Sequence, residues 1–166
     1  MLEPKPVTRE GLPRALEKAE RYRLLNEPVE AESICLDVLA VDPQNRQALI
    51  VLLLALTDQF EEGTSDALQR AREVLPRLRD EYERAYYAGI ICERRAKARL
   101  KHGGLGAGYA AYEALQEAMR WYEKAEALRP PGNDDAVLRW NTCVRILQRR
   151  HDLRAAPVDR SEPPLE

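Results

Sequence analysis

Residues that end or bend α-helices recur along this sequence at intervals of helical length. The breaks fall at Pro28, Asp42-Pro43, Glu62-Gly63, Gly103-Gly104 and Pro130-Pro131-Gly132. Proline has no amide proton to donate, and glycine readily adopts the left-handed conformations in which helices end. The segments between the breaks predict seven helices, at 12–25, 29–41, 45–59, 65–79, 81–102, 108–128 and 134–150.

Composition favours one all-α domain. Leu, Ala, Glu and Arg dominate the sequence, and charged residues make up 33% of it against 6% aromatic residues. A chain of 166 residues can bury a core without disulfides or metals as supports. The net charge of −2 provides no global basic field, so nucleic acid is a disfavoured partner.

Local signals refine the helix ends. Pro28 suits the first turn of a helix, where a missing amide proton costs nothing. Ser65 and Asn133 are expected N-caps, because their side chains accept from the first free amides. Pro76 lies inside the fourth predicted segment, which should kink or stop there.

The cysteines and the chain ends predict a cytoplasmic protein. Cys35, Cys92 and Cys143 are far apart among apolar neighbours, a pattern typical of reduced core thiols. Residues 1–11 form an N-terminal extension with prolines and charges where a signal peptide is apolar. The longest apolar run, 48–56, is about half of a membrane span. Residues 151–166 are expected to form a flexible tail.

Two segments share the spacing of a repeat. The second-helix pattern appears as Ala31-x3-Cys35-x2-Val38-x4-Pro43 and again as Ala118-x3-Tyr122-x2-Ala125-x4-Pro130. The preceding helices carry Ala15-x3-Ala19-x2-Tyr22 and Ala85-x2-Ala88-Gly89-x2-Cys92. Small residues at these positions let the two helices of a hairpin approach closely. Over 12–150 the chain resembles the tetratricopeptide repeat family, in particular its small bacterial-type members.

The resemblance implies a right-handed α-α superhelix of about three hairpins and a C-terminal capping helix. The repeats would span 12–45, 46–81 and 82–132, and the cap 134–150. Val137, Trp140, Val144 and Leu147 are expected on the inward face of the cap, with Arg139, Arg145 and Arg149 elsewhere. A closed antiparallel helical bundle remains the alternative.

The resemblance also implies a protein-interaction scaffold with a concave groove. The lining carried over from the family is Leu16, Glu20, Arg23, Gln47, Ile50, Leu54, Thr57, Glu83, Tyr86, Ile90 and Glu93, closed by Val137 and Asn141. The run 49–56 is apolar all round a helix, so part of it should face the groove and receive an apolar or amphipathic peptide segment. Two other occupants of the groove are a second copy of the chain and the chain's own tail. The remaining alternative is that the stack curls tightly enough to cover these apolar residues itself.

The chaperone-binding branch of the family does not fit. That groove clamps a C-terminal carboxylate with lysines, asparagines and an arginine. The corresponding positions here are Leu16, Glu20, Val51, Glu83 and Tyr87. None of these side chains makes the charge-assisted bonds that a carboxylate needs.

The third hairpin is longer than the repeat requires. The separation of Cys92 and Ala118 exceeds the family spacing by about 17 residues, which predicts an elongated hairpin with its bend within 96–112. Its tip would carry Arg99, Lys101, His102 and Tyr109. RNA or another anionic ligand bound by this basic tip is the alternative function, although cations also suit the end of a helix. The run "GGLGAG" lacks the strand and lysine of a phosphate loop.

No motif in the sequence indicates catalysis. The two histidines have no cysteine or carboxylate at metal-ligand spacing, and the patterns of zinc proteases, redox dithiols and serine hydrolases are absent. The sequence therefore predicts a protein that is not an enzyme and that uses no cofactor or metal.

Overall fold

The computed structural model describes residues 1–62 and 66–158. Its helices are α1 (Leu12–Leu24), α2 (Pro28–Val41), α3 (Arg46–Thr57), α4 (Ala67–Val74), the 3₁₀ turn η1 (Leu75–Arg77), α5 (Glu81–His102), α6 (Ala107–Leu128) and α7 (Asp135–Arg149). The part of the chain so described contains no strand, and the predicted all-α class is confirmed.

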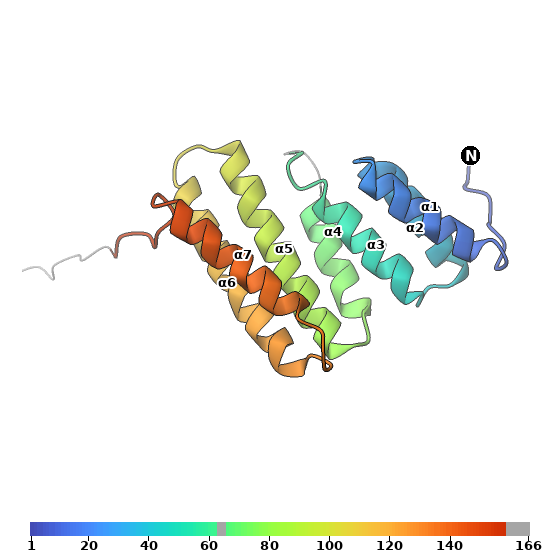
Figure 1. Cartoon of the computed structure of the whole chain (residues 1–166). Helices are drawn as coiled ribbons and strands as arrows, with labels where there is room; N and C mark the ends of the chain where they lie inside the picture. The colour runs from blue at the N-terminus through green and yellow to red at the C-terminus, as the bar shows by residue number, and fades with distance from the viewer. Residues whose placement is uncertain (63–65, 159–166) are drawn as a thin grey trace, which may run out of the picture.

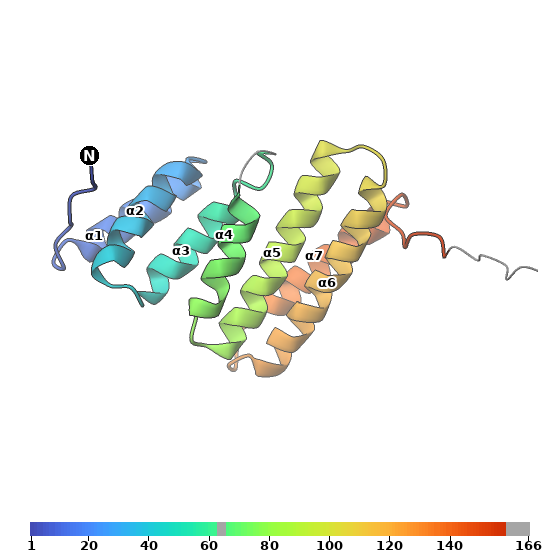
Figure 2. The same cartoon turned by 180° about the vertical axis from the view of Figure 1, so that it is seen from behind.

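Successive helices pack side by side and run in alternating directions (Figure 1). Helices α1, α3 and α7 lie toward the viewer in Figure 1, whereas α2, α4 and α6 come forward in the reverse view of Figure 2. Helix α3 also contacts both α1 and α5. The α1–α2 hairpin forms one end of the row, and α5, α6 and α7 form the other.

The helix ends largely follow the local signals. Pro28 is the first residue of α2, and the Asn45 side chain caps α3 by accepting from the Ala48 amide at 2.9 Å. Helix α4 stops at Val74 and passes into a 3₁₀ turn around Pro76, so the predicted stop is confirmed. Asn133 accepts from the Asp135 amide at 3.0 Å, one residue before the N-cap position. Ser65 lies outside the described residues.

The core forms two clusters. The first joins α1 to α4, and α3 dominates it, because every residue from Val51 to Leu53 is at most 4% exposed. The second joins α5, α6 and α7 around the fully buried ring of Tyr122. Burying α3 on nearly all sides leaves only Ile50 and Leu54 of its apolar run half-exposed.

Helices α5 and α6, each of 22 residues, cross where a glycine meets a ring. A methyl group on Gly89 would lie only 2.7 Å from Tyr122 Cδ1 and 2.9 Å from its Cζ. Ala118 and Ala125, on either side of Tyr122, are completely buried. Small residues therefore occupy the closest approach of these two helices, as their spacing predicts.

The inward face of α7 matches the predicted one only in part: Leu147 packs against the second cluster as predicted, but the buried stripe is shifted. Ala136 and Cys143 are buried, and Trp140 packs against the second cluster, whereas Val137 and Val144 remain half-exposed. The prediction was wrong for both valines, because the packed stripe begins one residue earlier. The prediction also placed Arg139 off the inward face, yet Arg139 reaches inward to a buried carboxylate.

The first residues after α7 pack against the protein core. Leu153 is only 6% exposed and belongs to the second cluster. Gly108 makes room for this turn, because a Cβ there would lie 2.8 Å from the Asp152 carbonyl oxygen. Within the segment expected to form a flexible tail, the structure thus packs Leu153 against the second cluster. Residues 159–166 lie outside the described part.

Candidate functional site

Helices α3 and α5 present an apolar surface with polar ends, which we call the α3–α5 face. Ile50 and Leu54 lie one turn apart on α3, and Tyr86 lies on the neighbouring α5; all three are half-exposed. Gln47 is exposed one turn before them. These four residues define the face, and they include the part of the predicted groove floor that a partner can reach.

Ion pairs between helices bound the α3–α5 face at both ends. At one end Arg46 of α3 binds Glu83 of α5. At the other end Asp58, just after α3, receives Arg94 of α5 at 2.8 Å and Arg23 of α1 at 2.8 Å. Arg46, Glu83 and Asp58 each lie about one helical turn beyond an apolar residue of the face, so charges flank the apolar strip at both ends.

The α1 edge of this surface is polar. Glu20 accepts from the Gln47 side chain at 3.1 Å, which links α1 to α3. Both side chains are exposed. Arg23 is half-buried against Asp58, so its charge is already compensated within the chain. Asn141 of α7 is half-exposed and makes no hydrogen bond that involves its side chain among the described residues.

Five residues of the predicted lining are buried, and one of them, Glu83, is 6% exposed. Leu16 is 5% exposed, Ile90 6% and Thr57 3%, and the Thr57 hydroxyl donates to the Leu54 carbonyl at 2.7 Å. Glu93 is 0% exposed. Placing these side chains in an open groove was wrong, because helical spacing assigns a residue to a face but does not show how far the neighbouring helices cover it.

Glu93 is the centre of a buried polar network instead. Its carboxylate accepts from Lys97 Nζ at 2.7 Å, from Tyr122 Oη at 3.0 Å and from Arg139 Nε at 3.1 Å, which joins α5 to α6 and α7. Burial opposes the charged form, but the two cations outweigh it and lower the pKa of Glu93 below its ordinary value. The network links α5 to α6 and α7, and its central carboxylate is buried and therefore closed to a ligand.

Tyrosines cluster beside the α3–α5 face. The Tyr86 ring stacks on Tyr82 with centroids 6.0 Å apart and meets Tyr87 edge-on at 5.0 Å. Burial raises the pKa of both Tyr86 and Tyr87 to about 12, so the rings are neutral at physiological pH. The cluster gives the α5 side of the face a rigid aromatic wall.

At the tip of the third hairpin, formed by α5 and α6, two of the predicted contact residues interact with groups of the same chain. The Arg99 guanidinium donates to the carbonyl oxygens of Gly103 and Leu105, the latter at 3.1 Å. Lys101 pairs with Glu61 at 2.5 Å, beyond the end of α3. His102 is exposed, and Tyr109 is half-buried.

The bend of this hairpin needs its glycines. Gly103, Gly104 and Gly106 have φ values of 67°, 89° and 74°, which ordinary side chains disfavour. The predicted role of Gly103 and Gly104 in ending the helix agrees with these angles. Gly108, the first residue of the predicted helix 108–128, lies in the first turn of α6.

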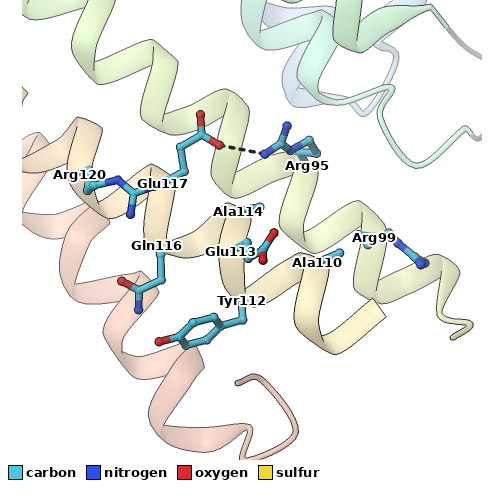
Figure 3. A pocket seen from close by; sticks show the side chains of 9 residues that line it. All are labelled: Arg95, Arg99, Ala110, Tyr112, Glu113, Ala114, Gln116, Glu117 and Arg120. Carbon is cyan, nitrogen blue, oxygen red and sulfur yellow. Dashed lines mark hydrogen bonds and ion pairs between the residues drawn. The ribbon is translucent and has the colours of Figure 1, made fainter. Parts of the chain in front are cut away.

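Sequence reasoning missed a surface hollow of about 640 Å³ along α5 and α6 (Figure 3). Arg95 of α5 and Glu117 of α6 form an ion pair across it at 3.0 Å, and both side chains are about one-third or more exposed. Tyr112 and Gln116 point away from this pair in Figure 3. The hollow combines three arginines with two glutamates, so it has no single charge preference. The only sequence signal for this hollow was the regular spacing of its lining residues along two helices.

Residues 1–62 and 66–158 contain no group of three His, Cys, Asp or Glu side chains placed to hold a metal ion. Within the same residues, no helix is both long enough and apolar enough to cross a membrane. All three cysteines are free and buried.

Comparisons with family models, with curated proteins and with solved structures find no match for this chain.

Proposed function

We propose that this protein is a non-enzymatic interaction scaffold of the tetratricopeptide type, which binds an apolar or amphipathic peptide segment on the α3–α5 face. The proposed architecture is a right-handed stack of three helical hairpins closed by α7. The contacts of α3 with both α1 and α5 support a stack, because they join the first helices of successive hairpins. The close crossing of Gly89 with Tyr122 supports the family spacing.

One observation carries the functional proposal: a half-exposed apolar strip lies between two sets of ion pairs. Ile50, Leu54 and Tyr86 make up the strip. Arg46–Glu83 and Asp58–Arg94 bound it. An apolar centre with a charged rim is the usual composition of a peptide-binding surface, where the centre contributes affinity and the rim sets register.

The alternative function, binding of RNA or another anionic ligand at the hairpin tip, has weaker support than binding at the α3–α5 face. Arg99 is engaged by backbone carbonyls and Lys101 by Glu61. A phosphate group would have to compete with these partners. The proposal therefore assigns binding to the α3–α5 face.

The test is a peptide selection with a matched control. The wild-type protein is immobilised and used to select from a random-peptide display library, and the enriched peptides are measured by fluorescence anisotropy. Leu54→Arg places a charge in the strip and should weaken binding at least about tenfold, since it removes apolar contact and leaves a cation to desolvate. Leu138→Arg, on α7 at a position 60% exposed, should bind as wild type.

Folding is checked for each variant by circular dichroism and thermal melting, because Leu54 also packs against the second cluster. Gln47→Arg offers a second variant on the same face at an exposed position, where folding is not at risk. Selected peptides that bind folded Leu54→Arg and Gln47→Arg as tightly as wild type would refute the proposed site.

A further inference from the structure

The outer surface of the α1–α2 hairpin leaves apolar side chains uncovered. Leu25 is 64% exposed, Val29 56% and Leu36 47%. Val29 and Leu36 lie on one stripe of α2, with the exposed Ser33 and Ala40 completing it. The α1–α2 hairpin forms one end of the molecule in Figure 1, and among the described residues none covers these side chains.

The same hairpin has a hollow along α1. It has a volume of about 770 Å³ and is lined by α1 residues and Leu25, including Lys18 and the half-buried Tyr22. Its walls are part apolar and part charged. A side chain of leucine size projecting from another molecule could therefore enter it.

The two helices of this hairpin carry opposite charges. The exposed surface of α1 holds Arg14, Lys18 and Arg21 with two acids, Glu17 and Glu20, and Glu20 is hydrogen-bonded to Gln47 of α3. Helix α2 has no basic residue, and its accessible acids are Glu30 and Asp37.

Several of these charges have no partner in the part of the chain that the structure describes. Among the described residues, Arg14, Glu30 and Asp37 form no ion pair or hydrogen bond through their side chains. Arg14 and Arg21 are seven residues apart, as are Glu30 and Asp37. Both spacings correspond to two helical turns, about 10 Å.

We propose that a second copy of this chain docks on the outer surface of the α1–α2 hairpin to form a two-fold symmetric dimer. A two-fold interface must be complementary to itself, because the same patch meets its own copy. Here the basic α1 of one protomer faces the acidic α2 of its partner, and the equal spacing of the charges matches them in register. Leu36 of each protomer enters the α1 hollow of the other. The proposal is independent of the peptide-binding function.

The first experiment measures the mass of the wild-type protein by sedimentation equilibrium at protein concentrations up to about 100 μM. A species of about twice the 19.0 kDa chain is expected. A wild-type protein that stays monomeric over this range overturns the proposal.

Variants then test the surface. Leu36→Glu should raise the dimer dissociation constant at least about tenfold, because it buries a charge in an apolar contact. Leu138→Glu, on α7, should leave the constant unchanged. A dimer that survives Leu36→Glu unaltered uses another surface, which overturns the proposed interface.

Charge exchange provides a test that loss of folding cannot mimic. The double variant Arg14→Glu with Arg21→Glu places acids against acids and should weaken the dimer at least about tenfold. Adding Glu30→Lys and Asp37→Lys restores opposite charges, whichever way the helices pair, and should bring the constant back to within about threefold of wild type. If the dissociation constant of the quadruple variant does not recover, α1 and α2 do not face each other in the dimer, which contradicts the proposed pairing.

Discussion

The buried carboxylate of Glu93 leads to a quantitative prediction about stability. Glu93→Ala removes the acceptor shared by Lys97, Tyr122 and Arg139. The Tyr122 hydroxyl is then left buried without a partner, which costs about 1–3 kcal/mol. The Arg139 side chain loses its counter-ion but is 30% exposed, so water compensates it in part. We expect a loss of about 3 kcal/mol, at the lower end of the values for broken buried ion pairs.

The assay is equilibrium unfolding in urea, monitored by circular dichroism, together with thermal melting. A loss of about 3 kcal/mol should lower Tm by about 6–12 °C in a protein of this size. Glu117→Ala is the matched control, because its ion pair with Arg95 at 3.0 Å lies at the surface, where each side chain is at least 34% exposed. Removal of that surface pair should cost about 1 kcal/mol or less.

The losses of stability in the two variants together test the structural role of Glu93. If Glu93→Ala loses no more stability than Glu117→Ala, the network does not hold α5, α6 and α7 together, and the structural role given to Glu93 is wrong. Glu93→Gln should fall between the two variants, because it keeps an acceptor for Tyr122 but loses the charge that both cations bind.

The pH dependence follows from the direction of the pKa shift. Because the folded pKa of Glu93 lies below its unfolded value of about 4.3, the folded protein favours the ionised carboxylate. This contribution is fully present above the unfolded pKa and is lost as the pH falls through the folded pKa. The stability difference between wild type and Glu93→Gln should therefore be constant from about pH 6 to 8 and should narrow below about pH 4. A difference that grows on acidification would contradict the assignment.

Two further predictions concern the packing of the core. Gly89→Ala should destabilise the protein by about 1–2 kcal/mol in urea unfolding, because the clash with the buried Tyr122 ring outweighs the gain in helix propensity; a neutral or stabilised variant would show that the helices can separate freely. Burial raises the pKa of Cys35 and Cys143 to about 12 and that of Cys92 to about 11. At pH 8 the native thiols should react with a disulfide reagent more than about a hundredfold more slowly than the thiols of protein unfolded in guanidinium; rapid reaction of all three native thiols would contradict their burial.

Helix positions could be predicted from the sequence because the signals that set them are local. Pro28 starts α2 and Pro76 ends α4. Each proline acts locally, because it lacks an amide proton and its ring restricts the backbone. The register of α7 was harder to predict. Both Val137 and Ala136 are apolar, and only the packing against α5 and α6 selects the stripe that contains Ala136.

The site could be predicted only in part, because burial depends on neighbours that are distant in sequence. Ile50 and Leu54 remain accessible, whereas Ile90 is covered, although all three lie in apolar segments. The inward position of Glu93 depends on Arg139, which follows it by 46 residues. One signal was available: Glu93 lies between Gly89 and Ala96, where small residues mark the packed side of α5.

The two ends of the proposed stack differ, and the difference connects the two proposals. Helix α7 closes one end and keeps Arg145 and Arg149 exposed, as a capping helix of a repeat protein requires. The other end exposes Leu25, Val29 and Leu36 and has no such cap. A second copy would cover this end and leave the α3–α5 face of each protomer open. A dimer would then hold two peptide sites in a fixed relation, so a ligand with two copies of a binding segment should bind wild type more tightly than monomeric Leu36→Glu, while a ligand with one copy should not distinguish them.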